Sequence, residues 1–243
     1  MNNLQRRYLA QQQELGHSVL YFEPAPAANI SAEKTAPSPP APAAPAPSGD
    51  KAARLEALYA HHQQCQNCRL GKTRNRFVFG SGSPDARLLF IGEAPGADED
   101  EQGLPFVGRA GQLLTKMIES GMGIPRSTVY IANILKCRPP GNRDPQPDER
   151  AACTPILLEQ IRIIQPEFIC CLGRISGRFL LKLDDSVLLK EMRQKFYDYE
   201  GTRVCVTYHP SALLQHPGWK VPAWEDLQFL MAAMGLVIPK NIK

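Results

Sequence analysis

Two short loops in this 243-residue chain carry side chains suited to catalysis. The first, GEAPG at residues 92–96, follows the apolar run LLFI at 88–91. The second, HPS at 209–211, follows the run VCVTY at 204–208. Loops at the carboxyl ends of parallel strands line the crevice in which ligands bind. We therefore expect an acidic, glycine-rich loop and a histidine loop to reach one pocket.

Four of the seven cysteines have the spacing and setting of metal ligands. Cys65 and Cys68 form a C-x2-C pair, from which two thiolates can reach one metal centre. Cys137 lies in a polar, proline-rich segment, and Cys153 follows it. Four thiolates suit either zinc or an iron–sulfur cluster. The other three cysteines lie in apolar runs, where cysteine packs as a small hydrophobe.

The elements that must position these residues are predicted from the apolar pattern. Strands are expected at about 87–92, 129–135, 168–172 and 203–208. Helical spacing is present over 108–121, in a segment before Pro166, and over about 223–234. Pro155 indicates that the middle helix starts or kinks there.

Strands that alternate with helices favour a parallel sheet covered on both faces, which is an α/β fold. The net charge of +4 permits binding to nucleic acid without indicating it. No apolar run approaches the ~20 residues that span a bilayer. The N-terminus lacks the apolar core of a signal peptide, so we expect a cytoplasmic protein without a disulfide framework.

The chain divides into three parts. Residues 24–50 hold eight of the 22 prolines and almost no large apolar side chain, which predicts a disordered linker. Residues 1–23 precede it and end in an apolar patch at 19–22, which is either a frayed tail or a docking peptide for a replication or repair protein. The folded body is expected over 51–243.

Five motifs in the body occur in the order known from one family. They are C-x2-C at 65–68, GEAPGADED at 92–100 with PFVGRAG at 105–111, YIANILKCRPPGNR at 130–143, a further cysteine at 153, and YHPSALL at 208–214. In this order they resemble the iron–sulfur-containing family 4 uracil-DNA glycosylases. The resemblance implies a three-layer α/β/α fold around a short, mainly parallel four-stranded sheet. It also implies a 4Fe–4S cluster on Cys65, Cys68, Cys137 and Cys153, with a structural role.

The same resemblance implies hydrolysis of the N-glycosidic bond of deoxyuridine in single- or double-stranded DNA. Phe106 matches the aromatic residue that stacks on uracil, and the Asn133 amide can pair with uracil N3–H and O4. His209 matches the catalytic histidine, whose donor stabilises negative charge at uracil O2. The backbone of the loop containing Ala94 and Gly96 can approach the base.

Glu93 has two open interpretations: it holds or polarises the attacking water, or it braces the loop. DNA contacts are expected from loop residues, because phosphate dominates affinity for DNA. Leu213 and Leu214 are expected to wedge into the space left by a flipped base. The candidates are Arg109, Lys136, Arg138, Arg143, Ser211, Leu213 and Leu214.

Other functions compete with this interpretation. The alternative is a non-catalytic iron–sulfur DNA-binding protein of the same fold, although such a scaffold has no reason to keep Phe106, Asn133 and His209 together. A zinc hydrolase of another substrate is a further class. One subgroup of the superfamily traps uracil-containing DNA covalently through a histidine in a basic inserted loop. The segment after Lys136 has neither the insert nor a histidine, so we do not expect covalent trapping. We expect a monomeric enzyme that releases its product and acts on further substrate.

Overall fold

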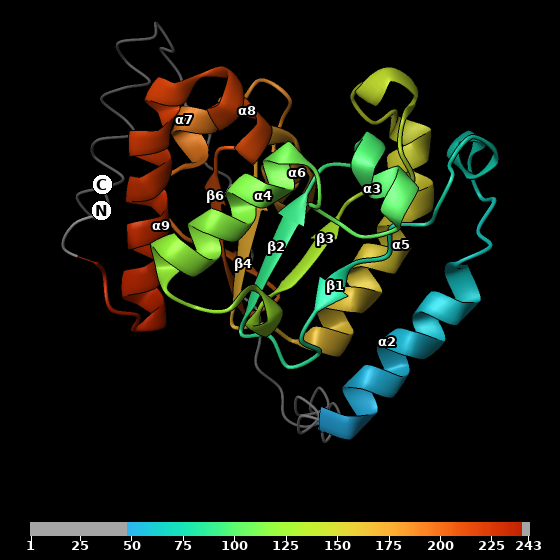
Figure 1. Cartoon of the computed structure of the whole chain (residues 1–243), viewed down its shortest axis with the longest axis horizontal. Helices are drawn as coiled ribbons and strands as arrows, with labels where there is room; N and C mark the ends of the chain where they lie inside the picture. Colours follow the sequence, from blue (N-terminus) through green and yellow to red (C-terminus); the bar gives the residue numbers. More distant parts are fainter. Residues whose placement is uncertain (1–47, 240–243) are drawn as a thin grey trace, which may run out of the picture. The chain divides into compact units, whose positions relative to one another are not determined.

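The computed structural model describes residues 48–239, so the predicted tail and most of the predicted linker lie outside the described residues. A mixed six-stranded sheet lies at the centre, in the order β1-β3-β2-β4-β6-β5 (Figure 1). The inner four strands are parallel, and each edge strand is antiparallel to its neighbour. The strands are β1 (Ser81–Gly82), β2 (Leu88–Gly92), β3 (Tyr130–Asn133), β4 (Phe168–Leu172), β5 (Tyr197–Tyr199) and β6 (Thr202–Thr207).

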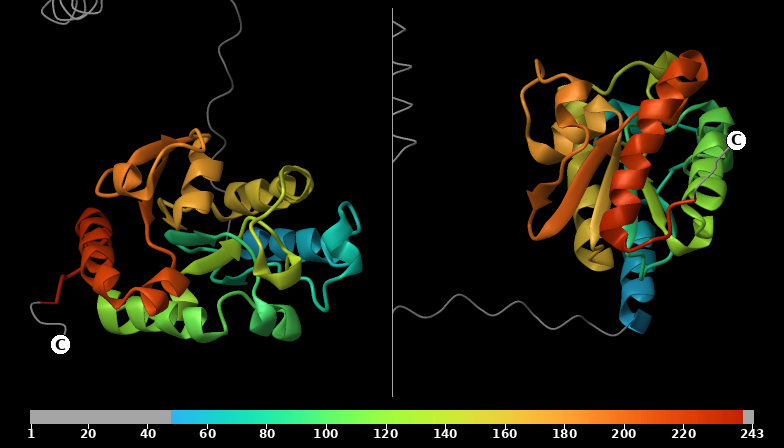
Figure 2. Two further views of the ribbon diagram at one scale, coloured as in Figure 1. Left: turned by 90° about the horizontal axis from the view of Figure 1, so that it is seen from above. Right: turned by 90° about the vertical axis from the view of Figure 1, so that its left-hand side faces the viewer.

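Helices cover both faces of the sheet (Figure 2), which confirms the three-layer α/β/α fold. One face packs against α2 (Ser48–His62), α5 (Pro147–Ile164), α6 (Arg174–Leu181) and α7 (Leu189–Met192). The other packs against α4 (Arg109–Lys116), η2 (Met117–Met122) and α9 (Lys220–Met234). The remaining helices are η1 (Arg69–Lys72), α3 (Ala97–Gln102), η3 (Arg126–Thr128), η4 (Pro140–Asn142), α8 (Pro210–Gln215) and η5 (Pro217–Trp219).

Strand β2 shows why the sequence forms a buried parallel sheet. Successive side chains of a strand point to opposite faces. Leu89 and Ile91 lie in the core beneath α5, whereas Leu88 and Phe90 lie in the core beneath α9. All four are almost fully buried. A strand covered on both faces needs a continuous apolar run, which is what residues 88–91 supply.

The prediction of four strands was correct for the parallel centre but missed both edges. Strand β1 has two residues and β5 has three, so neither is long enough to carry a hydrophobic period. Their partners, β3 and β6, are the outer strands of the parallel set. The short edge strands thus limit the open backbone at each side of the sheet.

Two helix predictions need correction. The helix expected to end at Gly121 continues as a π-helical turn, η2, and ends at Gly123, whose φ of 70° is in the left-handed region that glycine tolerates. Of the two alternatives for Pro155, a helix start or a kink, the start is wrong. Helix α5 begins at Pro147, where a proline without an N–H fits the first turn, and continues through Pro155.

Helix α2 begins at Ser48, so its first residues overlap the end of the predicted linker. Within residues 48–239, no helix is long and apolar enough to cross a membrane.

Candidate active site

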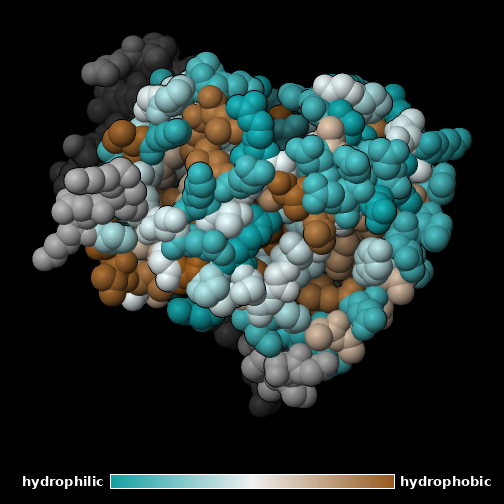
Figure 3. Space-filling view, in the orientation of Figure 1, coloured by the Kyte–Doolittle hydropathy of each residue, from teal (hydrophilic) through white to brown (hydrophobic). Residues whose placement is uncertain are grey.

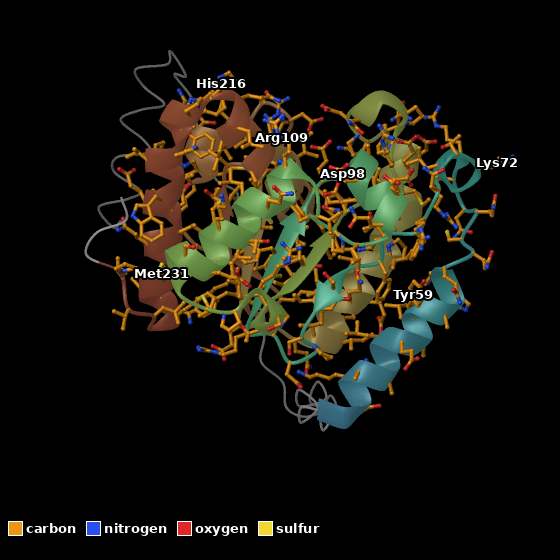
Figure 4. All side chains as sticks on the ribbon, viewed as in Figure 1. Tyr59, Lys72, Asp98, Arg109, His216 and Met231 are labelled. Atoms are coloured by element: carbon orange, nitrogen blue, oxygen red, sulfur yellow. The ribbon has the colours of Figure 1, made fainter. Side chains whose placement is uncertain are left out.

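A cavity of about 460 Å³ opens at the carboxyl ends of the parallel strands. The loops after β2 and β6 and the end of β3 all contribute to it, as the order of parallel strands predicts. Figure 4 labels Arg109 and Asp98, which lie on its rim at this end of the sheet. Its lining includes Glu93, Ala94, Pro95, Gly96, Asp98, Glu99, Phe106, Arg109, Asn133, Pro139, Asn142, Arg143, His209 and Ser211.

Asn133 ends strand β3 and presents a polar atom without a partner. Its side chain is buried, and Oδ1 has no hydrogen-bond partner within the described residues. The parallel register places Asn133 beside Gly92. A Cβ at Gly92 would collide with this Oδ1 and lie 2.6 Å from the Phe106 ring, so only glycine leaves the amide accessible. An unsatisfied buried acceptor is costly, and a ligand donor would satisfy it.

Phe106 forms the aromatic wall of the cavity. Its ring lies 5.6 Å from that of His209, centroid to centroid, with an interplanar angle of 35°. Its backbone adopts a φ of 54°, which a non-glycine residue rarely takes without support.

Two side chains that the sequence interpretation did not assign supply that support. Arg126 donates to the carbonyl oxygens of Pro105 (2.8 Å) and Phe106 (3.0 Å). Glu99 accepts from the amides of Val107 (2.8 Å) and Gly108 (3.0 Å), and its other oxygen accepts from Gly96 (3.1 Å). Glu99 therefore joins the glycine-rich loop to the loop of Phe106.

His209 is held in one tautomer by its own loop. The backbone amide of Ser211 donates to Nδ1 at 3.2 Å, and Ser211 Oγ lies 2.7 Å from the same nitrogen. A nitrogen that accepts a hydrogen bond is unprotonated, so in the neutral ring Nε2 carries the hydrogen. Burial lowers the pKa of His209 to about 4. At neutral pH, the ring is an uncharged donor through Nε2.

Glu93 lines the cavity with a perturbed carboxyl group. Burial and the nearby charge of Asp144 raise its pKa to about 7, while Arg174 and Arg150 act in the opposite direction. The ordinary value is 4.5, so near neutrality this group exchanges a proton readily. Neither arginine was identified from the sequence: they lie in the first turns of helices α6 and α5 and act on Glu93 through their charge.

Several residues expected to contact DNA lie at the mouth of the cavity. Arg109, Arg143 and Ser211 line it, and Arg109 is exposed. Arg143 is also paired with the buried carboxylate of Glu149, at 2.6 Å. Arg138 is half-buried and donates to Asn142, a rim residue, at 2.8 Å.

Two expected DNA contacts are wrong. Lys136 is fully buried, and its Nζ donates to the Asn133 carbonyl oxygen (2.8 Å) and to Gln160 Oε1 (2.6 Å). Burial lowers its pKa to about 7, and the group is closed off from any phosphate. Leu213 is also buried, so it anchors α8 to the body, whereas Leu214 is 37% exposed and remains available at the surface. Hydrophobic residues reach the surface over α8 in Figure 3.

The four candidate cysteines come together from three segments of the chain. Cys65 and Cys68 follow α2, Cys137 follows β3, and Cys153 lies in α5. All four belong to one packed cluster, in which Cys137 and Cys153 are buried. The Cys137 thiol is close enough to both members of the C-x2-C pair for their charges to raise its pKa, although burial is the larger cause. The remaining cysteines pack in β4 and β6 as core residues, as expected.

Two of the sulfurs accept hydrogen bonds, as metal-bound thiolates commonly do. Arg74 donates to Cys137 Sγ at 3.3 Å and to the Cys65 carbonyl oxygen, and the amide of Lys136 donates to Cys153 Sγ at 3.2 Å. No group of three or more His, Cys, Asp or Glu side chains within residues 48–239 is arranged to hold a single metal ion. The donor set, four thiols with two N–H···S bonds, fits a thiolate-bound cluster, which is larger than one ion.

Comparisons with known proteins bear on these residues. A family model described as the uracil DNA glycosylase superfamily matches residues 79–228, which include all the pocket residues. The type-4 uracil-DNA glycosylase of Saccharolobus solfataricus is 43% identical over 186 residues, covering 74% of this chain and 86% of that protein. The type-4 enzymes of Archaeoglobus fulgidus and Thermotoga maritima are also 43% identical, over 67% of this chain and 84% of their own lengths.

Proposed function

The chain belongs to the uracil DNA glycosylase superfamily and to its type-4 uracil-DNA glycosylases, and we propose that it flips uracil out of DNA and hydrolyses the N-glycosidic bond. The product is an abasic site. The observation that carries this proposal is the Asn133 Oδ1, which has no hydrogen-bond partner among the described residues and belongs to a residue that lines the same cavity as Phe106 and His209. The remaining residues of the cavity then have defined tasks.

Recognition of uracil follows from the hydrogen-bonding pattern of its Watson–Crick edge. A base must leave the helical stack before an enzyme can reach its glycosidic bond. The flipped uracil stacks on Phe106, and its N3–H donates to Asn133 Oδ1, the acceptor that otherwise has no partner. The amide nitrogen of Asn133 donates to uracil O4. Cytosine has an unprotonated N3 and an amino group at these positions, so it is rejected.

The departure of uracil places negative charge on the base, largely at O2. His209 Nε2–H is fixed as a donor by the contacts of Ser211 with Nδ1. An oriented neutral donor in a site shielded from water stabilises developing charge without the cost of reorienting solvent. The glycine-rich loop brings its backbone amides to the same side of the base.

Glu93 supplies a carboxylate for the attacking water. Its pKa of about 7 makes the ionised form available at neutral pH while keeping it basic enough to polarise water. The other interpretation, that Glu93 only braces the loop, lacks support, because no described residue donates a hydrogen bond to this carboxylate. Phosphate contacts come from Arg109, Arg143 and Ser211, which line the cavity, and from Arg138, which is hydrogen-bonded to the lining residue Asn142.

We assign the 4Fe–4S cluster to Cys65, Cys68, Cys137 and Cys153. When bound, such a cluster supplies a thermally stable crosslink between chain segments rather than a reacting group. These cysteines join the loop after α2, the segment after β3 and helix α5. No cysteine lines the active-site cavity, so the residues that handle uracil act without a thiolate.

Excision of uracil from a labelled oligonucleotide, followed by alkaline cleavage at abasic sites, tests the function. Strand cleavage at the uracil, absent for an otherwise identical thymine or cytosine strand, is the expected result. Binding to the uracil strand with no abasic product would instead identify a non-catalytic iron–sulfur DNA-binding protein.

The rate of the chemical step is expected to depend on the ionisation of Glu93. Because the carboxylate is the active form, activity is lost as pH falls through the pKa of about 7 and is constant above it. Below that pH the single-turnover rate should fall about tenfold per pH unit. Single-turnover rates measured between pH 5.5 and 8.5 give the profile. His209 is neutral throughout this range, since its pKa is about 4.

Glu93→Gln is the matched control for that profile. The variant has nearly the same shape but no ionisable group, so its rate should be lower and independent of pH. If the variant keeps the ionisation near pH 7, the profile comes from another group and the role of Glu93 is wrong.

Replacement of Cys137 by serine is expected to lower cluster content and folding yield together. The wild-type protein should be yellow-brown, with broad absorption near ~400 nm from thiolate-to-iron charge transfer. Cys137 ties the segment after β3 to the other ligands, so its loss removes both a ligand and a crosslink. Iron and sulfide analysis and thermal unfolding provide the measurements. Cys205→Ser, in strand β6, controls for the loss of a buried thiol outside the cluster.

A further inference from the structure

Four side chains form a continuous column of rings and charge next to α8. The Arg193 guanidinium lies 4.6 Å from the centroid of the Tyr208 ring. The Tyr208 and Trp219 rings are 5.3 Å apart at an interplanar angle of 35°, and the Trp219 and His216 rings are 4.3 Å apart at 37°. We name Arg193, Tyr208, Trp219 and His216 the aromatic column.

The inner end of the aromatic column is fixed by a buried ion pair. Arg193 Nε donates to Asp226 Oδ2 at 2.6 Å, and its Nη2 donates to the Pro222 carbonyl oxygen at 2.6 Å. Asp226 is only 5% exposed and also accepts from Thr207, the residue before Tyr208. The ion pair therefore fixes the Arg193 guanidinium, and the three rings pack in succession on it, which limits the conformational entropy that a stacking ligand would have to remove.

The outer end of the aromatic column faces water. Every residue from Leu214 to Val221 is exposed, and the indole of Trp219 is 41% exposed. A large aromatic residue that only completes a core is mostly buried. Here it is instead displayed beside Lys220, a cation, on a short and ordered segment.

The aromatic column stands close to the active site. Tyr208 directly precedes His209, and α8 separates His209 from His216 by six residues, or about 9 Å of helix. Figure 4 places His216 at the end of the molecule that also carries Arg109, the rim residue of the cavity. A DNA strand with uracil in the cavity thus has its neighbouring nucleotides within reach of the aromatic column.

We propose that Trp219 and His216 form a stacking site for an unpaired base of the DNA strand that flanks the uracil. This inference rests on the proposed function. Aromatic side chains bind bases of every sequence through their π-faces, and adjacent cations attract the phosphates. A base inside a duplex is already stacked on its neighbours, so the site favours single-stranded DNA over double-stranded DNA.

Substitutions of Trp219 test the proposal through binding. The ligand is a fluorescently labelled single strand with one 2′-fluoro-deoxyuridine, whose electron-withdrawing fluorine slows glycosidic cleavage. Trp219→Ala should weaken binding by roughly 5- to 150-fold, the usual effect of removing a stacking ring. Trp219→Phe keeps an aromatic face and should retain most of the affinity. For the matching duplex, the effect of Trp219→Ala should be markedly smaller.

An abasic scan identifies the occupant. Single abasic residues are placed in turn at each position near the fluorinated uridine, and binding to wild-type protein is measured. One position should weaken binding to the wild type but not to Trp219→Ala, because base and ring contribute through the same contact. Equal affinities of wild type and Trp219→Ala for the single strand would overturn the proposal, as would a scan that is identical for both proteins. A surface used by a protein partner would give these negative results.

Failure of the stacking site is distinguishable from failure of the proposed function. Single-turnover excision at saturating enzyme should be nearly the same for Trp219→Ala and wild type, since Trp219 does not line the cavity. A wild-type protein that excises uracil while the scan shows no dependence on Trp219 overturns only the stacking site. A wild-type protein without excision overturns the function itself.

Discussion

Replacing His209 by alanine is expected to slow uracil excision about 100- to 1000-fold, the usual cost of removing one donor aimed at developing charge. The fold should persist, because within residues 48–239 the imidazole is hydrogen-bonded only to Ser211, in its own loop. Affinity for uracil-containing DNA should change little, since the donor acts on charge that appears as the bond breaks.

Single-turnover kinetics with enzyme in excess measure this effect, because slow product release hides slow chemistry in steady-state assays. His61→Ala is the matched control: His61 is exposed on α2 and does not line the cavity, so its variant should excise at the wild-type rate. An unchanged single-turnover rate for His209→Ala would refute the role of Nε2 as the donor to uracil O2.

Ser211→Ala tests whether the orientation of the His209 ring matters for the rate, because the ring is kept while one of its two contacts is removed. The backbone amide of Ser211 still donates to Nδ1, so the tautomer is retained while the contact from Oγ is lost. We expect a rate between those of wild type and His209→Ala. This result follows if the loop, rather than the ring alone, directs Nε2 at the base.

Asn133→Asp is expected to cause the second large loss. The carboxylate keeps an acceptor for uracil N3–H but replaces the donor to O4 by a second acceptor, so two acceptors face each other in a buried site. Sites built around one hydrogen-bond pattern reject its opposite strongly, because the mismatched groups are left unpaired. Uracil excision should therefore fall by at least about 100-fold.

The pH dependence of the Asn133→Asp variant makes the test sharper. A carboxyl group at this buried position has a raised pKa, and its protonated form regains one donor. The loss should therefore be greater at pH 8.5 than at pH 6 when excision is measured per folded protein. Asn133→Ala removes both polar atoms and has no such added dependence. A folded Asn133→Asp protein with wild-type excision would show that another group reads the base.

The same variant tests whether the Watson–Crick edge is read at all. An acidic side chain pairs with the amino group of cytosine. We expect trace excision of cytosine by Asn133→Asp from single-stranded or mismatched DNA, where flipping costs least. Cytosine release by Asn133→Ala is not expected, since alanine offers no acceptor.

The sequence by itself determined the layers of the fold and the loops that carry the chemistry. The runs at 88–92 and 168–172 are apolar on both faces, and only a strand covered by helices on both sides buries such a run. Because β2 and β6 run parallel in the sheet, the glycine-rich loop and the histidine loop that follow them lie at the same edge. The ordered motifs also identified the family, which the comparisons confirmed.

Only the tertiary structure decided which polar side chains face the DNA and which hold the site together. Lys136 follows Asn133 by three residues and reads as a surface cation, yet its Nζ is satisfied by Gln160 from helix α5. Glu99 lies in the acidic run ADEDE at 97–101, which gives no sign of its role, yet its carboxylate holds the loop of Phe106. Whether a charge is buried depends on partners that are distant in sequence, and these meet only when the chain folds.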